Sequence, residues 1–380
     1  MFEYFATNYT WNLAIMAACN GGGIISEIDD ACRPLIDAAR RNDAAAQESW
    51  MQSWMKVAER VEEMAAAEER RDWRRSAGRK YWRASVYAFV AERLMAPHDP
   101  RRDRVYGKAL DCFKKAVTCQ NHPVEFVEVP YKDTSLPALF VKAEGDGRRP
   151  TMVHFDGLDL LKELLYLRGS AEELRLRGIS VLIVDHPGVG EALRRRGLKS
   201  FPETEVPAAA SVDYLEKRAD VDPDRIGIVA NSLGGYYAAR AAAFEKRFKC
   251  CVLWGALYDF GARLANRTEL SVSHFDYHLN WVFGGKDKAE TFEICKRFTL
   301  QGVTEKITCP LLVIHGENDR QVPVADAERT YREAVNSPRR ELKIFTLAEG
   351  GAEHCQIDNL ANYQDVMANW TAEVLGATRL

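Results

Sequence analysis

The first part of the chain alternates apolar and polar positions with the period of an α-helix. Apolar residues recur three and four positions apart, as at Trp54, Val57, Val61 and Met64. This segment is rich in Ala, Glu, Arg and Met. "APHDPRRD" at 96–103 breaks the pattern before a further helical stretch. We therefore predict an all-helical N-terminal domain over residues 1–120.

The period changes after residue 121. Two runs of apolar and β-branched residues, 124–131 and 136–144, predict a β-hairpin with "KDTS" at its turn. Six further apolar runs predict strands at 151–156, 179–185, 225–230, 249–255, 310–316 and 341–347. Helical patterns separate several of them, at 162–177, 207–219, 234–247 and 324–336. Apolar strands alternating with helices indicate an α/β fold, with a mostly parallel, doubly wound sheet covered on both faces.

The alternation is interrupted over about 260–300, where no strand pattern occurs and aromatic residues gather in "FDYHLNWVFGG". We predict a helical insertion there. The domain assignment is therefore 1–120 for the helical domain and 121–380 for the catalytic α/β domain that carries the insertion.

Composition narrows the class of protein without identifying it. The net charge is −3, so the overall charge does not favour binding to nucleic acid or to an anionic membrane. The nine cysteines form neither a C-x-x-C pair nor a zinc-type cluster with histidine, and they are typical of free thiols in a reducing compartment. The sequence predicts no signal peptide, membrane span or metal site, which favours a cytoplasmic protein.

"IVANSLGGYYAAR" at 228–240 carries the first chemical signal. A buried strand ends at Ala230, Ser232 follows at a turn, and a helix opens at Gly234. This strand–turn–helix context is that of a nucleophile elbow, with alanine in the first position of the usual G-x-S-x-G pattern. The turn brings residues 230 and 234 together, so both must be small. The alternative is an ordinary serine that caps a helix.

Two later strand ends favour the catalytic interpretation of Ser232. Asp319 follows the strand 310–316, and His354 lies in a glycine-containing loop after the last strand. The chain order Ser…Asp…His and the strand-end positions match a serine-hydrolase triad, in which the aspartate orients the histidine. His154 and His315 lie inside strands, and we expect them in the core or behind the site.

An acyl-transfer site also needs donors for a developing oxyanion. The N–H of Leu233, next to Ser232 at a helix N-terminus, is expected to supply one. The loop "HFDGLDLLKE" is expected to supply the second, from Gly157 or Leu158, and the sequence does not choose between them. Glu191, in the strand-end loop "VDHPGVGE", is either a helix-start carboxylate or a substrate-facing group.

These segments resemble one branch of the α/β-hydrolase superfamily. "VDPDRIGIVANSLGGYYAAR", "GLDLLKE", "DHPGVGE" and "HGENDRQVP" are similar to segments of the branch that contains bacterial 2,6-dihydroxypseudooxynicotine hydrolase, fungal hydrolases that shorten polyketide pigment precursors, and fermentation-respiration-switch esterase-like proteins. The resemblance spans roughly 120–375 and extends more loosely over the helical N-terminus.

The resemblance implies an α/β-hydrolase fold, the triad Ser232, Asp319 and His354, and no metal or organic cofactor. It implies cleavage of a carbon–carbon bond in a β-diketone-like small molecule, or of an ester or thioester; some relatives instead promote acyl transfer or ring closure. It also implies that the helical N-terminus packs over the active site. An aromatic or polyketide-like substrate could then contact five aromatic residues, Tyr4, Tyr9, Trp11, Tyr277 and Trp281, which could equally pack the domain junction.

Other classes of function have weaker support. Basic and aromatic residues interleave over 70–83, but helical spacing places Trp73, Ala77 and Tyr81 on one face and the arginines largely on another. This pattern favours an amphipathic helix over a nucleic-acid site. A non-catalytic scaffold is disfavoured because all three triad positions are filled, and a peptidase because no propeller-like repeats precede the α/β domain. The helical domain could support a homodimer.

Overall fold

The computed structural model describes residues 1–41, 43–265 and 273–377. Contacts between Cα atoms divide the chain into two units. The first contains residues 1–123 and the beginning of α13 (Ser273–Phe283), and the second contains most of the chain from residue 124 onward.

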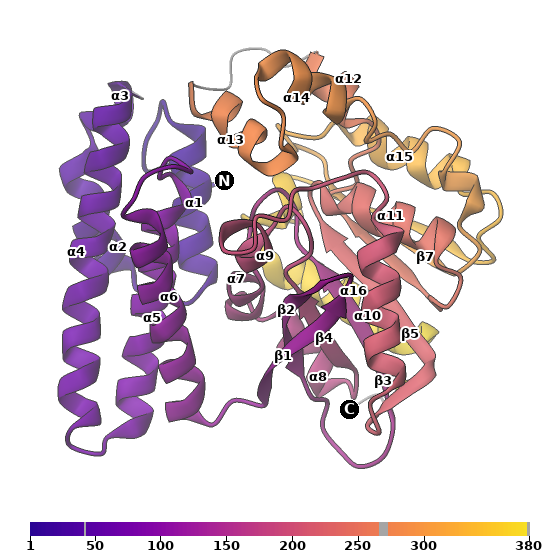
Figure 1. The fold of residues 1–380 in the computed structure, drawn as a ribbon, viewed down its shortest axis with the longest axis horizontal. Helices are drawn as coiled ribbons and strands as arrows, with labels where there is room; N and C mark the ends of the chain where they lie inside the picture. The colour runs from indigo at the N-terminus through magenta and orange to yellow at the C-terminus, as the bar shows by residue number, and fades with distance from the viewer. Residues whose placement is uncertain (42, 266–272, 378–380) are drawn as a thin grey trace. The chain divides into compact units, whose positions relative to one another are not determined.

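The first unit is helical, as predicted. Figure 1 shows its long helices side by side, and α5 packs against both α4 and α6. In chain order the helices are α1 (Tyr9–Asn20), α2 (Ile25–Cys32), the 3-10 helix η1 (Arg33–Leu35), α3 (Ala38–Arg41), α4 (Ala44–Glu69), α5 (Arg74–Arg93) and α6 (Arg102–Gln120).

The core of this unit confirms most of the predicted helical stripes. On α4, Trp54, Val57 and Val61 are buried, whereas Met64 is 46% exposed because it lies at the edge of the stripe. The predicted apolar face at the start of α5 is also incomplete. Ala77 and Tyr81 are buried, but Trp73 precedes the helix, is 48% exposed and stacks against the Arg71 guanidinium.

The second unit is built on an eight-stranded sheet with the order β1-β2-β4-β3-β5-β6-β7-β8. The first three strands in this order pair antiparallel, and the rest are parallel. All eight predicted strands are present: β1 (Val124–Tyr131), β2 (Thr134–Val141), β3 (Arg149–Phe155), β4 (Ser180–Val184), β5 (Val221–Asn231), β6 (Cys251–Trp254), β7 (Leu311–Gly316) and β8 (Arg340–Phe345).

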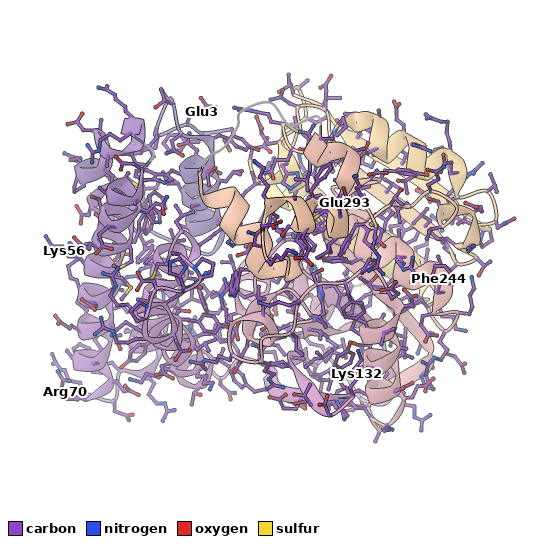
Figure 2. The ribbon with its side chains drawn as sticks, turned by 45° about the horizontal axis from the view of Figure 1, so that its top comes forward. Glu3, Lys56, Arg70, Lys132, Phe244 and Glu293 are labelled. Carbon is purple, nitrogen blue, oxygen red and sulfur yellow. The ribbon has the colours of Figure 1, made fainter. Side chains whose placement is uncertain are left out.

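Two local predictions are corrected by backbone geometry. The hairpin turn is shorter than "KDTS", because Thr134 already pairs with Tyr131; Lys132 occupies the turn with a φ of +50° and is exposed (Figure 2). The single helix predicted over 162–177 is two helices, α7 (Lys162–Leu167) and α8 (Ser170–Leu176). Gly169 separates them with a φ of +88°, which a continuing helix cannot hold.

Helices cover both faces of the sheet, as a doubly wound fold requires. In Figure 1, α10 (Glu205–Glu216) and α11 (Gly234–Phe244) lie in front of the strands, and α16 (Leu360–Val374) lies behind them, packed against α8. The other helices are α9 (Gly190–Arg194), α12 (Phe260–Ala265), α14 (Lys288–Cys295), η2 (Thr304–Lys306), α15 (Val324–Glu333) and η3 (His354–Gln356).

The predicted insertion is helical in its described part, where α12, α13 and α14 occupy the segment between β6 and β7. All nine cysteines are free thiols. Within the described ranges, no helix is both long enough and apolar enough to cross a membrane.

Gly235 sets the distance between α11 and the sheet. A Cβ at this position would lie 2.6 Å from Ala256 Cα and 2.8 Å from Leu257 N, and backbone atoms cannot rotate away. We expect Gly235→Ala to lower the free energy of unfolding by about 3 kcal/mol in urea denaturation. Gly302→Ala is the control, because no atom lies within 4 Å of its added Cβ; its φ of +73° should cost about 1 kcal/mol. Equal losses in the two variants would contradict this account.

Candidate active site

Ser232 lies in a strained turn between β5 and α11. Its φ is +62°, a conformation that non-glycine residues rarely adopt, and its N–H donates to the Trp254 carbonyl over 2.7 Å. A Cβ added to Gly234 would come within 2.7 Å of the Ala230 Cβ. The expectation that residues 230 and 234 face each other and must be small is therefore met, and alanine is accommodated in the first position.

The three side chains of the predicted triad are brought together. His354 Nδ1 lies 2.7 Å from Asp319 Oδ2, and His354 Nε2 lies 2.9 Å from Ser232 Oγ. Since a carboxylate only accepts, Nδ1 carries the hydrogen in the neutral ring, and Nε2 accepts from the serine hydroxyl. Asp319 follows β7 and His354 opens η3 after β8, so the three residues come from the ends of three strands in one sheet.

Asp319 is held in place by its own loop. The N–H groups of Gln321 and Val322 donate to Asp319 Oδ1 over 2.8 and 2.9 Å, which leaves Oδ2 for His354. His315 lies behind this carboxylate, with Nε2 3.6 Å from Oδ2 and 2.9 Å from the Val322 carbonyl. His315 thus supports the loop from behind, whereas His154 is fully buried in β3, as expected for a core residue.

Asp319 and His354 each stabilise the charged form of the other. Burial by itself would lower the pKa of His354, but the Asp319 charge and hydrogen bond outweigh burial and hold the pKa well above its ordinary value. Burial would likewise raise the pKa of Asp319, but the nearby imidazolium keeps that pKa below its ordinary value. The pair therefore favours a charged histidine, the form that a general base reaches when it takes a proton.

The loop after β3 lies against Ser232. A Cβ on Gly157 would lie 2.8 Å from Ser232 Cβ, so only glycine permits this approach. The Gly157 N–H donates to Asp156 Oδ1 over 2.7 Å and is therefore already used. Within the part of the chain that the structure describes, the N–H groups of Leu158 and Leu233 make no hydrogen bond. This geometry favours Leu158 over Gly157 as the second donor.

A buried ionic cluster lies beneath this loop, and the sequence patterns did not predict it. Lys162 Nζ lies 2.7 Å from Glu163, 2.8 Å from Asp185 and 3.3 Å from Glu191. Burial raises the pKa of Glu163 to about 7, although the Lys162 charge opposes this. Glu191, one of the candidate substrate-binding residues, is held by Lys162 and also donates its own N–H to Asp185 over 2.8 Å.

Cys355 also lies next to the site, and the sequence analysis did not predict this, as it did not predict the cluster around Lys162. Its Sγ lies 3.5 Å from His354 Nε2, and both Cys355 and Gln356 have a positive φ. The only sequence signal was its position directly after the histidine.

Three of the aromatic candidates, Tyr4, Tyr9 and Trp11, belong to the helical first unit. Tyr4 donates its hydroxyl to Asp29 over 2.5 Å, and Trp11 is buried in the helical unit against Phe5 and Trp50. Tyr9 begins α1 and is partly exposed.

In the second unit, the Trp281 carbonyl accepts from Lys199 over 2.7 Å, and Arg194 approaches its ring. The side chain of Tyr277 lies outside the described residues.

Comparisons with known proteins agree with this architecture. The model of the prolyl oligopeptidase family matches residues 168–378. The chain is 27% identical to 2,6-dihydropseudooxynicotine hydrolase of Paenarthrobacter nicotinovorans, covering 90% of this chain and 89% of the relative. It is also 27% identical to 20-hydroxy-prefusarin hydrolase FUS2 of Gibberella moniliformis, with coverage of 85% and 87%. The crystal structure of 2,6-dihydroxy-pseudo-oxynicotine hydrolase superposes with a TM-score of 0.77 at 25% identity, covering 95% of each chain.

The charge coupling in the site predicts a measurable titration. In Asp319→Asn the carboxylate charge is lost while burial remains, so the pKa of His354 should fall below the ordinary histidine value. Histidine-selective ¹⁵N NMR across a pH series would measure it, with His354→Gln to assign the signal. Burial lowers the pKa of His154 to about 3, and His154 serves as an internal control that should not move. An unchanged His354 pKa in Asp319→Asn would show that the carboxylate does not govern the imidazole.

Proposed function

The chain belongs to the prolyl oligopeptidase family, and on this premise we propose that it is a serine hydrolase with Ser232 as nucleophile, His354 as general base and Asp319 as the residue that orients His354. The observation that carries the proposal is the hydrogen-bond chain from Ser232 Oγ through the His354 ring to Asp319. A helix cap alone does not require a histidine within 2.9 Å of the serine hydroxyl.

The first half of the reaction forms an acyl-enzyme. Ser232 Oγ attacks the substrate carbonyl carbon while His354 Nε2 takes the hydroxyl proton, and the Asp319 charge stabilises the imidazolium. The carbonyl oxygen becomes an oxyanion, and we assign the N–H groups of Leu233 and Leu158 as its hydrogen-bond donors. The bond from the carbonyl carbon to the leaving group then breaks, and His354 returns the proton to that group.

The second half releases the acid. A water molecule gives a proton to His354 and attacks the acyl carbon, a second oxyanion forms, and Ser232 leaves with the proton from His354. The balance is one water consumed and one carboxylic acid formed for each bond cleaved. Apart from the substrate and this water molecule, every step uses side chains and N–H groups of the chain.

We assign a small molecule as substrate. We favour hydrolysis of the carbon–carbon bond that joins one carbonyl carbon of a β-diketone to the carbon between its two carbonyl groups. In a β-diketone the leaving group is an enolate, because the neighbouring carbonyl delocalises the electron pair that the broken bond leaves. The likeness to 2,6-dihydropseudooxynicotine hydrolase over nine-tenths of the chain supports this order of preference. A carboxylic ester or thioester is the second candidate, since the same triad cleaves both kinds of bond; acyl transfer or ring closure would follow if a substrate hydroxyl or carbanion replaced water.

A fluorophosphonate probe tests the nucleophile directly. The wild-type protein should be labelled on Ser232, and peptide mass spectrometry should locate the adduct there. Ser232→Ala should not be labelled and should lose at least about 10³-fold in kcat. Ser211, a buried serine on α10 that bonds the Pro207 carbonyl, provides the control variant Ser211→Ala, which should be labelled like the wild type. A folded wild-type protein that resists labelling would refute the proposal.

Competing substrates test which bond is cleaved. We expect aryl 1,3-diketones to be hydrolysed with a kcat/KM at least about tenfold above that of p-nitrophenyl acetate, because an enzyme that has evolved for a diketone binds the transition state of that substrate more tightly than the transition state of an unrelated ester. Ultraviolet absorbance follows diketone loss, and mass spectrometry identifies the acid and ketone formed. Ser232→Ala must abolish both activities. Rapid ester turnover with no diketone cleavage would assign the protein to the esterases instead.

A further inference from the structure

We propose that His186 is a positioning residue that holds the oxyanion loop, residues 156–158, in its working geometry. The inference rests on the proposed function, because it concerns the donors that would stabilise the oxyanion. His186 follows β4 in the segment "DHPGVGE", and neither the sequence patterns nor the triad assigned it a role.

His186 spans the gap between two strand-end loops. Its Nε2 lies 3.1 Å from the carbonyl oxygen of Asp156, the residue before Gly157, and its Nδ1 lies 3.1 Å from the Pro187 carbonyl. The side chain is 1% exposed. The ring packs on Phe155 at 4.5 Å and against the edge of Tyr237 at 4.8 Å between centroids, so its orientation is fixed from two sides.

The Asp156 carbonyl belongs to the peptide group that places Gly157. In a trans peptide the C=O and the N–H point in opposite directions, so fixing one fixes the plane of both. The carbonyl faces His186 Nε2, and the Gly157 N–H on the other side donates to Asp156 Oδ1 over 2.7 Å. This peptide group is thus held at both ends. The orientation of this peptide group determines where the next residue, Leu158, begins, and the Leu158 N–H is the proposed second donor.

The same segment holds the rest of the loop. The Gly190 N–H donates to the Leu160 carbonyl over 2.7 Å, and the Lys162 N–H donates to Asp185 Oδ1 over 2.8 Å. The stretch 185–190 therefore contacts the stretch 156–162 at its beginning, middle and end. Of these three contacts, the one that His186 makes is to Asp156, the residue before Gly157, which lies against Ser232.

The role requires a neutral ring with its hydrogen on Nε2. Burial lowers the pKa of His186 to about 4, although its carbonyl partners oppose this, so the ring is neutral at physiological pH and has one N–H. With that hydrogen on Nε2, the ring donates to Asp156. With it on Nδ1, the Asp156 carbonyl would face a lone pair and the tie between the loops would be lost.

Two variants of His186 separate donation from packing. His186→Phe keeps a ring between Phe155 and Tyr237 but removes the donor, whereas His186→Gln keeps an N–H donor near the position of Nε2. Tyr237→Phe is the control, since it removes the hydroxyl that bonds Ser200 but leaves a ring against His186. The readouts are the fluorophosphonate inactivation rate of Ser232, the affinity for an aryl trifluoromethyl ketone, which forms a tetrahedral oxyanion on the serine, and the kcat and KM for p-nitrophenyl acetate.

We expect His186→Phe to lose about 10- to 100-fold in inactivation rate, in trifluoromethyl ketone affinity and in kcat, with KM changed less than about threefold. His186→Gln should recover most of the loss, and Tyr237→Phe should stay within about threefold of the wild type. A folded His186→Phe with wild-type rates and affinity overturns the inference. So does an equal loss in His186→Phe and His186→Gln, because that pattern reflects packing alone.

Two further results also bear on the inference: failure of His186→Phe to fold, and failure of the wild-type protein to be labelled. If His186→Phe does not fold, His186→Met replaces it as the variant without a donor, and the inference requires His186→Gln to exceed it at least tenfold in inactivation rate. Equal rates overturn it. If the wild-type protein itself is not labelled on Ser232, the proposed function fails; if it is labelled and the His186 variants match it, only the role of His186 fails.

Discussion

The left-handed backbone at Ser232 is the constraint on which the rest of the site depends. A non-glycine residue in this conformation costs on the order of 1 kcal/mol, and the surrounding structure must compensate for it. The Trp254 carbonyl accepts the Ser232 N–H, and the small residues Ala230 and Gly234 leave room for the turn. The turn at Ser232 ends the strand, and among the described residues the next N–H, that of Leu233, has no hydrogen-bond partner at the beginning of α11.

The parallel part of the sheet brings the other residues of the site to Ser232. β5, β7 and β8 carry Ser232, Asp319 and His354 at their carboxyl ends, and β3, next to β5, carries the loop that touches the serine. Parallel strands end at one edge, so residues far apart in the sequence meet there without long connecting loops. Because β4 lies on the other side of β3, the segment 185–190 is the natural support for that loop.

Sequence periodicity predicted the strands and both helical regions, because each depends on local patterns of burial. The meeting of Ser232, Asp319 and His354 could also be predicted, since residue type, strand-end position and chain order are all visible in the sequence. The break at Gly169 and the short hairpin turn were missed because single φ angles decide them. The cluster around Lys162 depends on contacts between loops, and no local pattern records such contacts. The preference for Leu158 over Gly157 depends on a single hydrogen bond within the loop, from the Gly157 N–H to Asp156 Oδ1, which the sequence does not reveal.

The pairing of the stretches 156–162 and 185–190 also bears on how such a hydrolase can be altered. Each stretch supplies the hydrogen-bond partners of the other, and Gly190 leaves no room for a side chain above Asp185, whose carboxyl carbon lies 2.0 Å from the position of an added Cβ. A chimera that imports one loop from a relative would bring donors without their acceptors. The two loops, separate in the sequence, thus form a single unit for grafting, and we expect them to tolerate exchange together better than one at a time.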